Sequence, residues 1–303
     1  STMRKWIFRI FVILIVVTFL NLAFMKRELS KMYGGHTKLA ELSLGEDFTQ
    51  SFILENVNVL STSSDDFSAS QTVSVKDGII TLVGEDIDVA EGVSVVDGKG
   101  MFLVPGFTDS HVHLWESEND LLLYLANGVT QIREMNGSKT HLRWKKQIQD
   151  GRLGPDLFVV APQLATFSFF EGLLVGPTQN KTIVRSEDHV NKAVKGFKRS
   201  GYDAIKASSF LSHENYLATS KAAKDNDITL IGHIPMAANL QDFINSNQKE
   251  TAHIEELMKA LDREFGGYTG KTTDEFLDFV REKSDSLAVE LRQNGKSVTS
   301  TLW

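Results

Sequence analysis

The sequence predicts an α/β protein built on a TIM-like (β/α)8 barrel of about seven strands, therefore incomplete, with a small N-terminal β-sandwich domain and an N-terminal transmembrane helix. Three observations predict this fold. An apolar run lies near the N-terminus, short β-branched segments follow it, and from Pro105 onward strands alternate with amphipathic helices. We therefore expect a membrane anchor or signal segment at 1–30, a linker at 31–50, a small β domain at 51–104 and a barrel at 105–303.

The run from Trp6 to Met25 is almost wholly apolar and is long enough for one bilayer crossing. No small-residue cleavage site is visible near its end, so we interpret it as an uncleaved signal anchor, with a cleaved signal peptide as the alternative. Cations lie before, within and after the run, at Arg4, Lys5, Arg9, Lys26 and Arg27. Those on the N-terminal side favour an N-in orientation, which predicts a membrane-anchored protein whose folded part is periplasmic or extracellular.

Composition narrows the class of partner. With 42% hydrophobic and 23% charged residues, the chain has ordinary globular composition. The net charge of -7 gives no general basic surface, so we expect a small-molecule or dipeptide substrate and no nucleic acid. The absence of cysteine excludes disulfides, thiolate metal sites, a cysteine nucleophile and a lipid anchor attached through cysteine. The oligomeric state does not follow from the sequence.

Residues 51–104 are predicted to form a small β domain. Their β-branched residues alternate with polar ones, and Lys76-Asp77-Gly78 and Asp97-Gly98-Lys99-Gly100 provide turns between the segments. The predicted strands are Phe52 to Leu60, Thr72 to Val75, Gly78 to Val83, Ser94 to Val96 and Met101 to Val104.

The barrel segment is predicted from its alternating pattern. The expected strands are Gly106 to Trp115, Val129 to Met135, Asp156 to Leu164, Tyr202 to Ser208, Ile228 to Pro235, Thr251 to Met258 and Ser297 to Leu302. The expected helices between them are Asn119 to Asn127, Ser138 to Gln149, Glu187 to Ser200, His213 to Asp227 and Thr273 to Asn294. A complete barrel takes about 250 residues and eight strands, so one βα unit is expected to be missing. Residues 167–182 are predicted to be a loop over the barrel mouth.

His111 and His113 form the sharpest local motif. Residues two apart in a strand face the same side, so both imidazoles can bind one metal ion at the end of the first barrel strand. An exposed pair of histidines at a strand end is the alternative interpretation.

Three further side chains fall at the ends of later predicted strands: Lys206, His233 and His253. The C-terminal strand ends of such a barrel are where its chemistry is located. An ammonium on a buried parallel strand is costly to desolvate unless it is paired or chemically altered, so Lys206 is either half of a partly buried salt bridge or a modified ligand.

Phe102-Leu-Val-Pro-Gly-Phe-Thr-Asp-Ser-His-Val-His113, followed by Lys206, His233 and His253 in this order, resembles the amidohydrolase superfamily, most closely its imidazolonepropionase-like and prolidase-like branch. The resemblance covers residues 51–303 and implies a metal-dependent hydrolase of C–N bonds in amides, peptides or cyclic amides. It also implies a binuclear site, with two Zn as the expected cofactors. His111 and His113 would hold one ion, His233 and His253 the other, and Lys206, carboxylated by carbon dioxide, would bridge them.

The chain departs from the pattern of this superfamily at its end. Members carry an aspartate after the eighth strand that ligates metal and transfers the proton, and here the expected position lies beyond Trp303. No catalytic residue is therefore assigned, and we expect a C-terminally truncated, poorly active fragment. Ser1 and Thr2 before Met3 suggest that the N-terminal end is not the natural start either.

The alternatives to this hydrolase are a lactonase or deaminase of the same superfamily and a non-catalytic, truncated metal-binding barrel protein.

The other polar candidate residues are given structural interpretations. Asp109 either orients a ligand or bonds to nearby backbone. Arg133 and Glu134 are interpreted as a structural pair at the barrel mouth, with substrate contact as the alternative. Surface exposure is expected for the remaining candidates, Glu255, Glu256, His36, His141, His189 and His213.

Overall fold

The computed structural model describes residues 2–40, 50–85, 87 and 92–301, and within these the chain forms two compact units. One comprises Ser1–Lys38 and Thr108–Trp303, and the other Leu39–Phe107. Residues 41–49 of the predicted linker at 31–50, and the end of the predicted strand Ser297 to Leu302, lie outside the described residues.

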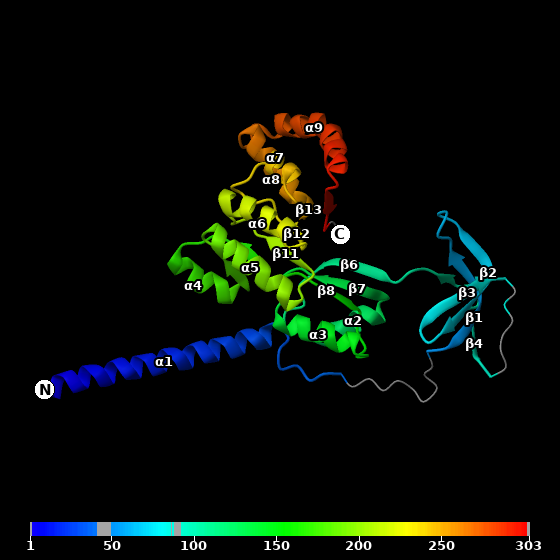
Figure 1. Ribbon diagram of the computed structural model, residues 1–303, viewed down its shortest axis with the longest axis horizontal. Helices are drawn as coiled ribbons and strands as arrows, with labels where there is room; N and C mark the ends of the chain where they lie inside the picture. The colour runs from blue at the N-terminus through cyan, green and yellow to red at the C-terminus, as the bar shows by residue number, and fades with distance from the viewer. Residues whose placement is uncertain (1, 41–49, 86, 88–91, 302–303) are drawn as a thin grey trace. The chain divides into compact units, whose positions relative to one another are not determined.

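The N-terminal segment is one helix, α1 (Thr2–Met32), labelled at the blue end of the ribbon in Figure 1. None of its residues is buried in the protein, although it is apolar enough and long enough to cross a membrane. The helix ends at Met32, and Gly34 in the turn that follows has a φ of 86°, a value that glycine adopts without strain.

The smaller unit is a β-sheet with strand order β3-β2-β1-β4, in which β5 also pairs with β1. Its strands are β1 (Phe52–Leu60), β2 (Phe67–Lys76), β3 (Ile79–Gly84), β4 (Ser94–Asp97) and β5 (Phe102–Leu103). Strands β1 and β2 are antiparallel, whereas β4 and β5 run parallel to β1. Ile53, Val57 and Val73 are its buried apolar residues. Each strand overlaps one of the strands predicted for this segment.

The larger unit alternates strands with helices, and its pairings are parallel wherever a register is resolved. Strands β6, β7 and β8 form one sheet, and a second has the order β10-β9-β11-β12-β13-β14. A parallel bridge between Val160 and Ala204 links the two. The bounds are β6 (Phe107–Val112), β7 (Val129–Glu134), β8 (Asp156–Val159), β9 (Gln163–Ala165), β10 (Lys181–Ile183), β11 (Ala204–Ala207), β12 (Thr229–Gly232), β13 (Gln248–Ala252) and β14 (Ser297–Thr299).

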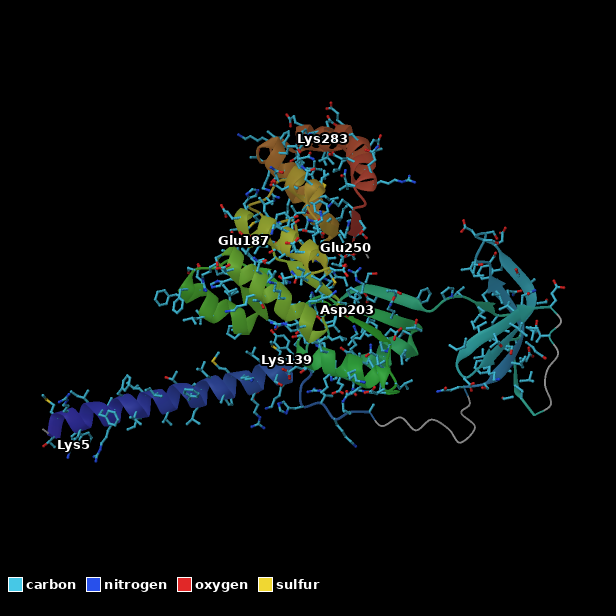
Figure 2. The ribbon with its side chains drawn as sticks, viewed as in Figure 1. Lys5, Lys139, Glu187, Asp203, Glu250 and Lys283 are labelled. Atoms are coloured by element: carbon cyan, nitrogen blue, oxygen red, sulfur yellow. The ribbon has the colours of Figure 1, made fainter. Side chains whose placement is uncertain are left out.

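Helices pack against these strands and bury separate apolar clusters, of which the larger two include Leu121 and Tyr216 in one and Phe243 and Leu261 in the other. They are α2 (Asp120–Ala126), α3 (Lys139–Gln149), α4 (Phe169–Thr178), α5 (Glu187–Ser200), α6 (His213–Asp225), α7 (Leu240–Asn245), α8 (Ile254–Phe265) and α9 (Thr273–Gln293). Glu187 at the start of α5 faces solvent, while Glu250 lies among the strands (Figure 2). Several helices begin where a side chain accepts a hydrogen bond from the first turn, at Ser138, Ser168, Ser186, Ser212 and Asn239.

The predicted loop at 167–182 is wrong, because this segment contains α4 and β10. Ser168 and Glu171 form a capping box that starts the helix, and Pro177 lies in its last turn, where a break costs little. The predicted strand Thr251 to Met258 is also too long. It ends at Ala252, and α8 follows because Leu257, Ala260 and Leu261 are buried at helical spacing.

The third predicted barrel strand is divided into β8 and β9 at Pro162, which has no N–H for a strand pairing. The predicted α/β class is confirmed.

Replacing Leu230 on β12 by alanine should lower the free energy of unfolding by about 2–5 kcal/mol, because a fully buried leucine leaves a cavity when it is truncated. Urea denaturation of the full chain in detergent measures this change. The matched control is Leu217→Ala on α6, where the side chain is 46% exposed and the expected loss is below about 1 kcal/mol. Equal losses in the two variants would contradict the packing described here.

Candidate metal centre

The five predicted ligands all lie at or just after C-terminal strand ends of the larger unit. They come from four strands: His111 and His113 from the end of β6, Lys206 from β11, His233 from the residue after β12, and His253 from the residue after β13. Strands β11, β12 and β13 are parallel neighbours, so their C-terminal ends meet at one edge of the sheet. The strand order therefore brings together side chains that are far apart in sequence.

Three imidazole rings gather in one group. The ring centroids of His111 and His253 are 4.5 Å apart, and those of His233 and His253 are 5.4 Å apart. The rings of His111 and His113 are 5.3 Å apart, but His113 lies on the side of Glu134. The structure thus forms a histidine cluster from strands that belong to both sheets.

Burial keeps the clustered imidazoles neutral. Desolvation, reinforced by the positive charge of Lys206, lowers the pKa of His111 from 6.5 to about 2 and that of His233 to about 3. Burial also lowers the pKa of His253. A neutral imidazole has a free nitrogen lone pair, which is the form that binds a metal ion.

Lys206 is the most unusual cation of the described chain, because its side chain is only 1% exposed. Burial lowers its pKa to about 8, although the carboxylates of Glu134 and Glu250 act in the opposite direction. No described carboxylate forms a close ion pair with it. The predicted salt-bridge alternative for Lys206 is therefore not what the structure contains.

The backbone around the cluster is constrained. Gly232 has a φ of 118°, and a Cβ atom there would lie 2.6 Å from the carbonyl oxygen of Ala207 and 2.7 Å from Cγ of Lys206. Only glycine fits this position, and it sets the direction in which His233 leaves β12. His253 itself has a φ of 71°, which is uncommon outside glycine and is typical of functional sites.

Hydrogen bonds orient two of the rings. Ser209 Oγ lies 3.0 Å from Nδ1 of His233, and Thr301 Oγ1 lies 2.9 Å from Nδ1 of His253. In contrast, Nδ1 of His111 is buried and has no hydrogen-bond partner. An unpaired buried polar atom is costly in a folded protein, and a bound cation would satisfy it.

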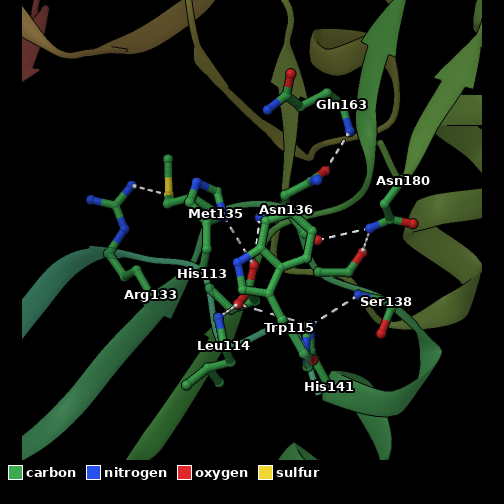
Figure 3. Close-up of polar contacts among 12 residues, drawn as sticks. His113, Leu114, Trp115, Arg133, Met135, Asn136, Ser138, His141, Gln163 and Asn180 are labelled. Carbon is green, nitrogen blue, oxygen red and sulfur yellow. Dashed lines mark hydrogen bonds and ion pairs between the residues drawn. The ribbon is translucent and has the colours of Figure 1, made fainter. Parts of the chain in front are cut away.

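Glu134, at the end of β7, is a site residue that the sequence predicted only as a partner of Arg133. Its carboxylate is 1% exposed and accepts hydrogen bonds from the backbone N–H groups of Leu114, at 2.5 Å, and Asn136, at 2.8 Å. It also lies 3.6 Å from Nδ1 of His113. Figure 3 labels its partners His113, Leu114 and Asn136. Burial alone would raise its pKa, but His113, His141 and the two N–H groups outweigh burial and lower it.

The predicted pair of Arg133 with Glu134 is wrong, because adjacent strand residues point to opposite faces. Arg133 instead forms a two-pronged ion pair with Glu250, at 2.9 and 3.0 Å. Glu134 points the other way, toward His113.

The expected surface position of His141 and Glu256 is also wrong. His141 is buried, where it caps α3 and its Nε2 lies 2.6 Å from the carbonyl oxygen of Trp115. Glu256 is buried and pairs with Lys259.

The other structural interpretations can be compared directly. Asp109 accepts a hydrogen bond from the backbone N–H of His111, so it bonds to nearby backbone. Glu255, His36 and His189 are exposed, as expected, while His213 is partly exposed and pairs with Asp242 at 3.2 Å.

The donors of the cluster fit a divalent metal by their chemistry. Neutral imidazoles and an unpaired buried nitrogen are suitable ligands for zinc. Within the described residues, however, no group of three or more His, Asp or Glu side chains is already arranged to hold an ion.

Comparisons with known proteins agree with this fold. No family model matches the chain. Among solved structures, it is similar to a bottromycin amidohydrolase, with a TM-score of 0.56, 21% identity and coverage of 81% of this chain and 49% of the other. It is also similar to a putative prolidase from Bifidobacterium longum, with a TM-score of 0.57 and 18% identity over 70% of this chain and 57% of the other. A Xaa-Pro dipeptidase with bound methionine in its active site has a TM-score of 0.57 and 18% identity over 82% of this chain and 78% of the other.

Short stretches also match curated sequences. An imidazolonepropionase of Phocaeicola vulgatus is 56% identical over 45 residues, which are 14% of this chain and 11% of that protein. An N-acetylglucosamine-6-phosphate deacetylase of Lysinibacillus sphaericus is 39% identical over 66 residues, which are 22% of this chain and 16% of that protein. The chain thus matches only a small part of its curated relatives and about half of the bottromycin enzyme.

The chain shares a parallel α/β fold with these solved structures and short sequence stretches with the curated proteins. These findings confirm the predicted resemblance to the amidohydrolase superfamily.

Replacing Glu134 by glutamine should lower the free energy of unfolding by about 1–3 kcal/mol, because the amide keeps the shape but loses charge-assisted hydrogen bonds in a buried site. Urea denaturation compares it with Glu255→Gln, an exposed control on α8. If both variants unfold alike, Glu134 does not carry the network assigned to it.

Proposed function

We propose that the protein is a metal-dependent hydrolase that cleaves C–N bonds in amides, peptides or cyclic amides at a binuclear site. The observation that carries this proposal is the cluster of neutral imidazoles beside the buried Lys206 at the ends of neighbouring parallel strands. Such donors have little structural value in a buried position, because they are left desolvated and partly unpaired. Metal binding explains why they are there.

In this proposal, His111 and His113 would hold one Zn ion, and His233 and His253 would hold the other. Lys206 would supply a shared ligand once its neutral amine had added to carbon dioxide, which would form a carbamate and release a proton. The lowered pKa of Lys206 supports this step, because it makes the neutral amine accessible near pH 8. When bound, the ions would polarise the scissile carbonyl and lower the pKa of water.

The protein's own residues position these ligands. The Glu134 carboxylate lies beside Nδ1 of His113, which leaves Nε2 of the ring available for an ion. Both carboxylate oxygens of Glu250 are paired with Arg133, so the negative charge of Glu250 near Lys206 is already balanced by another cation. We assign no proton-transferring catalytic residue among residues 2–301.

We propose further that the larger unit is part of a (β/α)8 barrel and that the smaller unit is part of a composite β-sandwich. The open strand order from β6 to β14 supports the first proposal. The largely exposed apolar side chains of the small sheet support the second, since a second sheet would cover them: Ile79, Ile80, Leu82, Val95 and Val96. The domain limits 51–104 and 105–303 belong to the same proposal.

We also propose that α1 anchors the protein in a membrane through residues 6–25, with the folded units on the extracytoplasmic side. Its length, hydropathy and full exposure support an anchor. The cations at Arg4, Lys5 and Arg9 support the orientation.

The full-length protein should contain about two divalent ions per chain, as measured by elemental analysis of the purified protein. Chelation should abolish hydrolysis of a panel of dipeptides and cyclic amides, and zinc should restore it. His111→Ala should lose metal and activity, because a ligand is removed, whereas His189→Ala on exposed α5 should retain both.

A protein that binds no metal would refute the hydrolase. Metal without turnover of any amide would favour the non-catalytic alternative, and release of ammonia or opening of lactones would favour the deaminase or lactonase.

The protein should remain in the membrane pellet after alkaline extraction. Charges at the middle of a span cost about 2.5–3.5 kcal/mol each, so the double variant Leu14→Lys, Val17→Lys should be released. Leu39→Lys lies after α1 and is the matched control. A mature protein whose mass lacks residues 6–25 would instead support a cleaved signal peptide.

A further inference from the structure

A cavity of about 480 Å³ opens beside His113 within the larger unit. One side is formed by polar residues of the candidate site, His113, Glu134, Asn136 and His141. The opposite side is formed by the C-terminal part of α1. The helix proposed to be an anchor therefore provides a wall of the space next to a proposed metal ligand.

Contacts after the end of α1 hold it at this cavity. Tyr33 stacks on Trp115, with ring centroids 4.4 Å apart, and the backbone N–H of Glu116 donates to the carbonyl oxygen of Tyr33 at 3.0 Å. Ser30 hydrogen-bonds the Glu116 carboxylate. A Cβ atom on Gly34 would lie 2.7 Å from Cβ of Ser117, so the turn after α1 fits closely against the segment that follows β6.

The two sides of the cavity differ in chemistry. Leu22, Met25 and Leu29 of α1 present apolar side chains, and Pro177 of α4 adds to them, while Lys26 and Ser30 of α1 also line the cavity. A ligand that fills the cavity thus needs an apolar portion along α1 and a polar portion at His113. A dipeptide of small residues satisfies only the second requirement.

The position of the cavity along α1 indicates where this apolar portion comes from. Met25 is the last residue of the apolar run, and Leu29 is one turn beyond it. A helix rises about 1.5 Å per residue, so the cavity lies within one or two turns of the edge of the bilayer in which the run would be embedded.

Helix α4 presents a second apolar surface. Phe169, Phe170, Leu173 and Leu174 are all largely exposed, Phe170 by 80% and Leu174 by 71%, and the last residues of the same helix line the cavity. Exposed aromatic and leucine side chains on a short helix are typical of a surface that enters the interfacial layer of a membrane.

We propose that the cavity binds the hydrocarbon chain of a fatty-acyl amide that enters from the lipid bilayer, and that this places the amide C–N bond at His113. The reaction adds water across that bond, so that the carbonyl carbon gains the oxygen and the nitrogen takes up the proton, releasing a fatty acid and an amine. The inference rests on the proposed hydrolase and on the proposed anchor, and it names their shared substrate class.

The test uses full-length protein in phosphatidylcholine vesicles and a series of N-acyl amino acids from acetyl to dodecanoyl. Each methylene buried in the cavity should raise kcat/KM by up to about fourfold, until the cavity is full. The double variant Met25→Ala, Leu29→Ala should lose most of this dependence on chain length. Leu20→Ala, Phe24→Ala, on the same helix but away from the cavity, is the matched control.

A second readout does not depend on turnover. A dodecanoyl amide with a diazirine in its chain should cross-link to Tyr33 or Trp115 on irradiation, as located by peptide mass spectrometry, and excess unlabelled dodecanoyl amide should prevent it. The acetyl amide at equal concentration should not compete.

The outcomes separate this inference from the proposals beneath it. Metal binding and hydrolysis that do not vary with chain length, or cross-links only outside the cavity, would overturn the fatty-acyl substrate and leave the hydrolase standing, with a soluble dipeptide as its substrate. Absence of metal and of all hydrolysis would overturn both. If both double variants lose the dependence on chain length equally, the dependence comes from partitioning into the bilayer. This result would also overturn the proposal that the cavity binds the acyl chain.

Discussion

The ammonium of Lys206 has lost almost all of its water, and no described carboxylate replaces that water at close range. The neighbouring residues reflect this constraint. The positive charge of Lys206 helps to keep the adjacent imidazoles neutral, and the Cγ of its side chain is one reason why β12 ends in Gly232. A buried lysine without a partner is unstable as a cation, so the site favours chemistry that changes its charge.

Most of the strands and helices could be predicted because each has a local cause. Strands β11 and β12 are buried apolar runs apart from Lys206 and Thr229, and helices such as α5 and α6 begin at serine caps. The prediction was wrong where a local pattern is ambiguous. The apolar stretch in α4 is compatible with a loop, a strand or a helix, and Ser168 and Glu171 decide in favour of the helix.

The candidate site was predictable as a set of residue types at strand ends, but its surroundings were not. Glu134 was not identified as a neighbour of His113, because nothing in its local sequence distinguishes a carboxylate that faces this histidine from one that faces solvent. The same holds for His141, whose burial depends on the carbonyl of Trp115, 26 residues away in sequence. Contacts of this range depend on the three-dimensional path of the chain. The contribution of α1 to the cavity beside His113 also depends on the path of the chain and could not be predicted from local sequence.

The turn at Gly34 and the stack of Tyr33 on Trp115 connect the apolar helix to the larger unit without a free spacer. Membrane anchors are often treated as modules that can be exchanged between proteins, because any sufficiently apolar helix inserts equally well. Here Met25 and Leu29 would have to suit two environments at once, lipid on one side and the cavity on the other. An unrelated span grafted onto this protein would restore its location but not its selectivity.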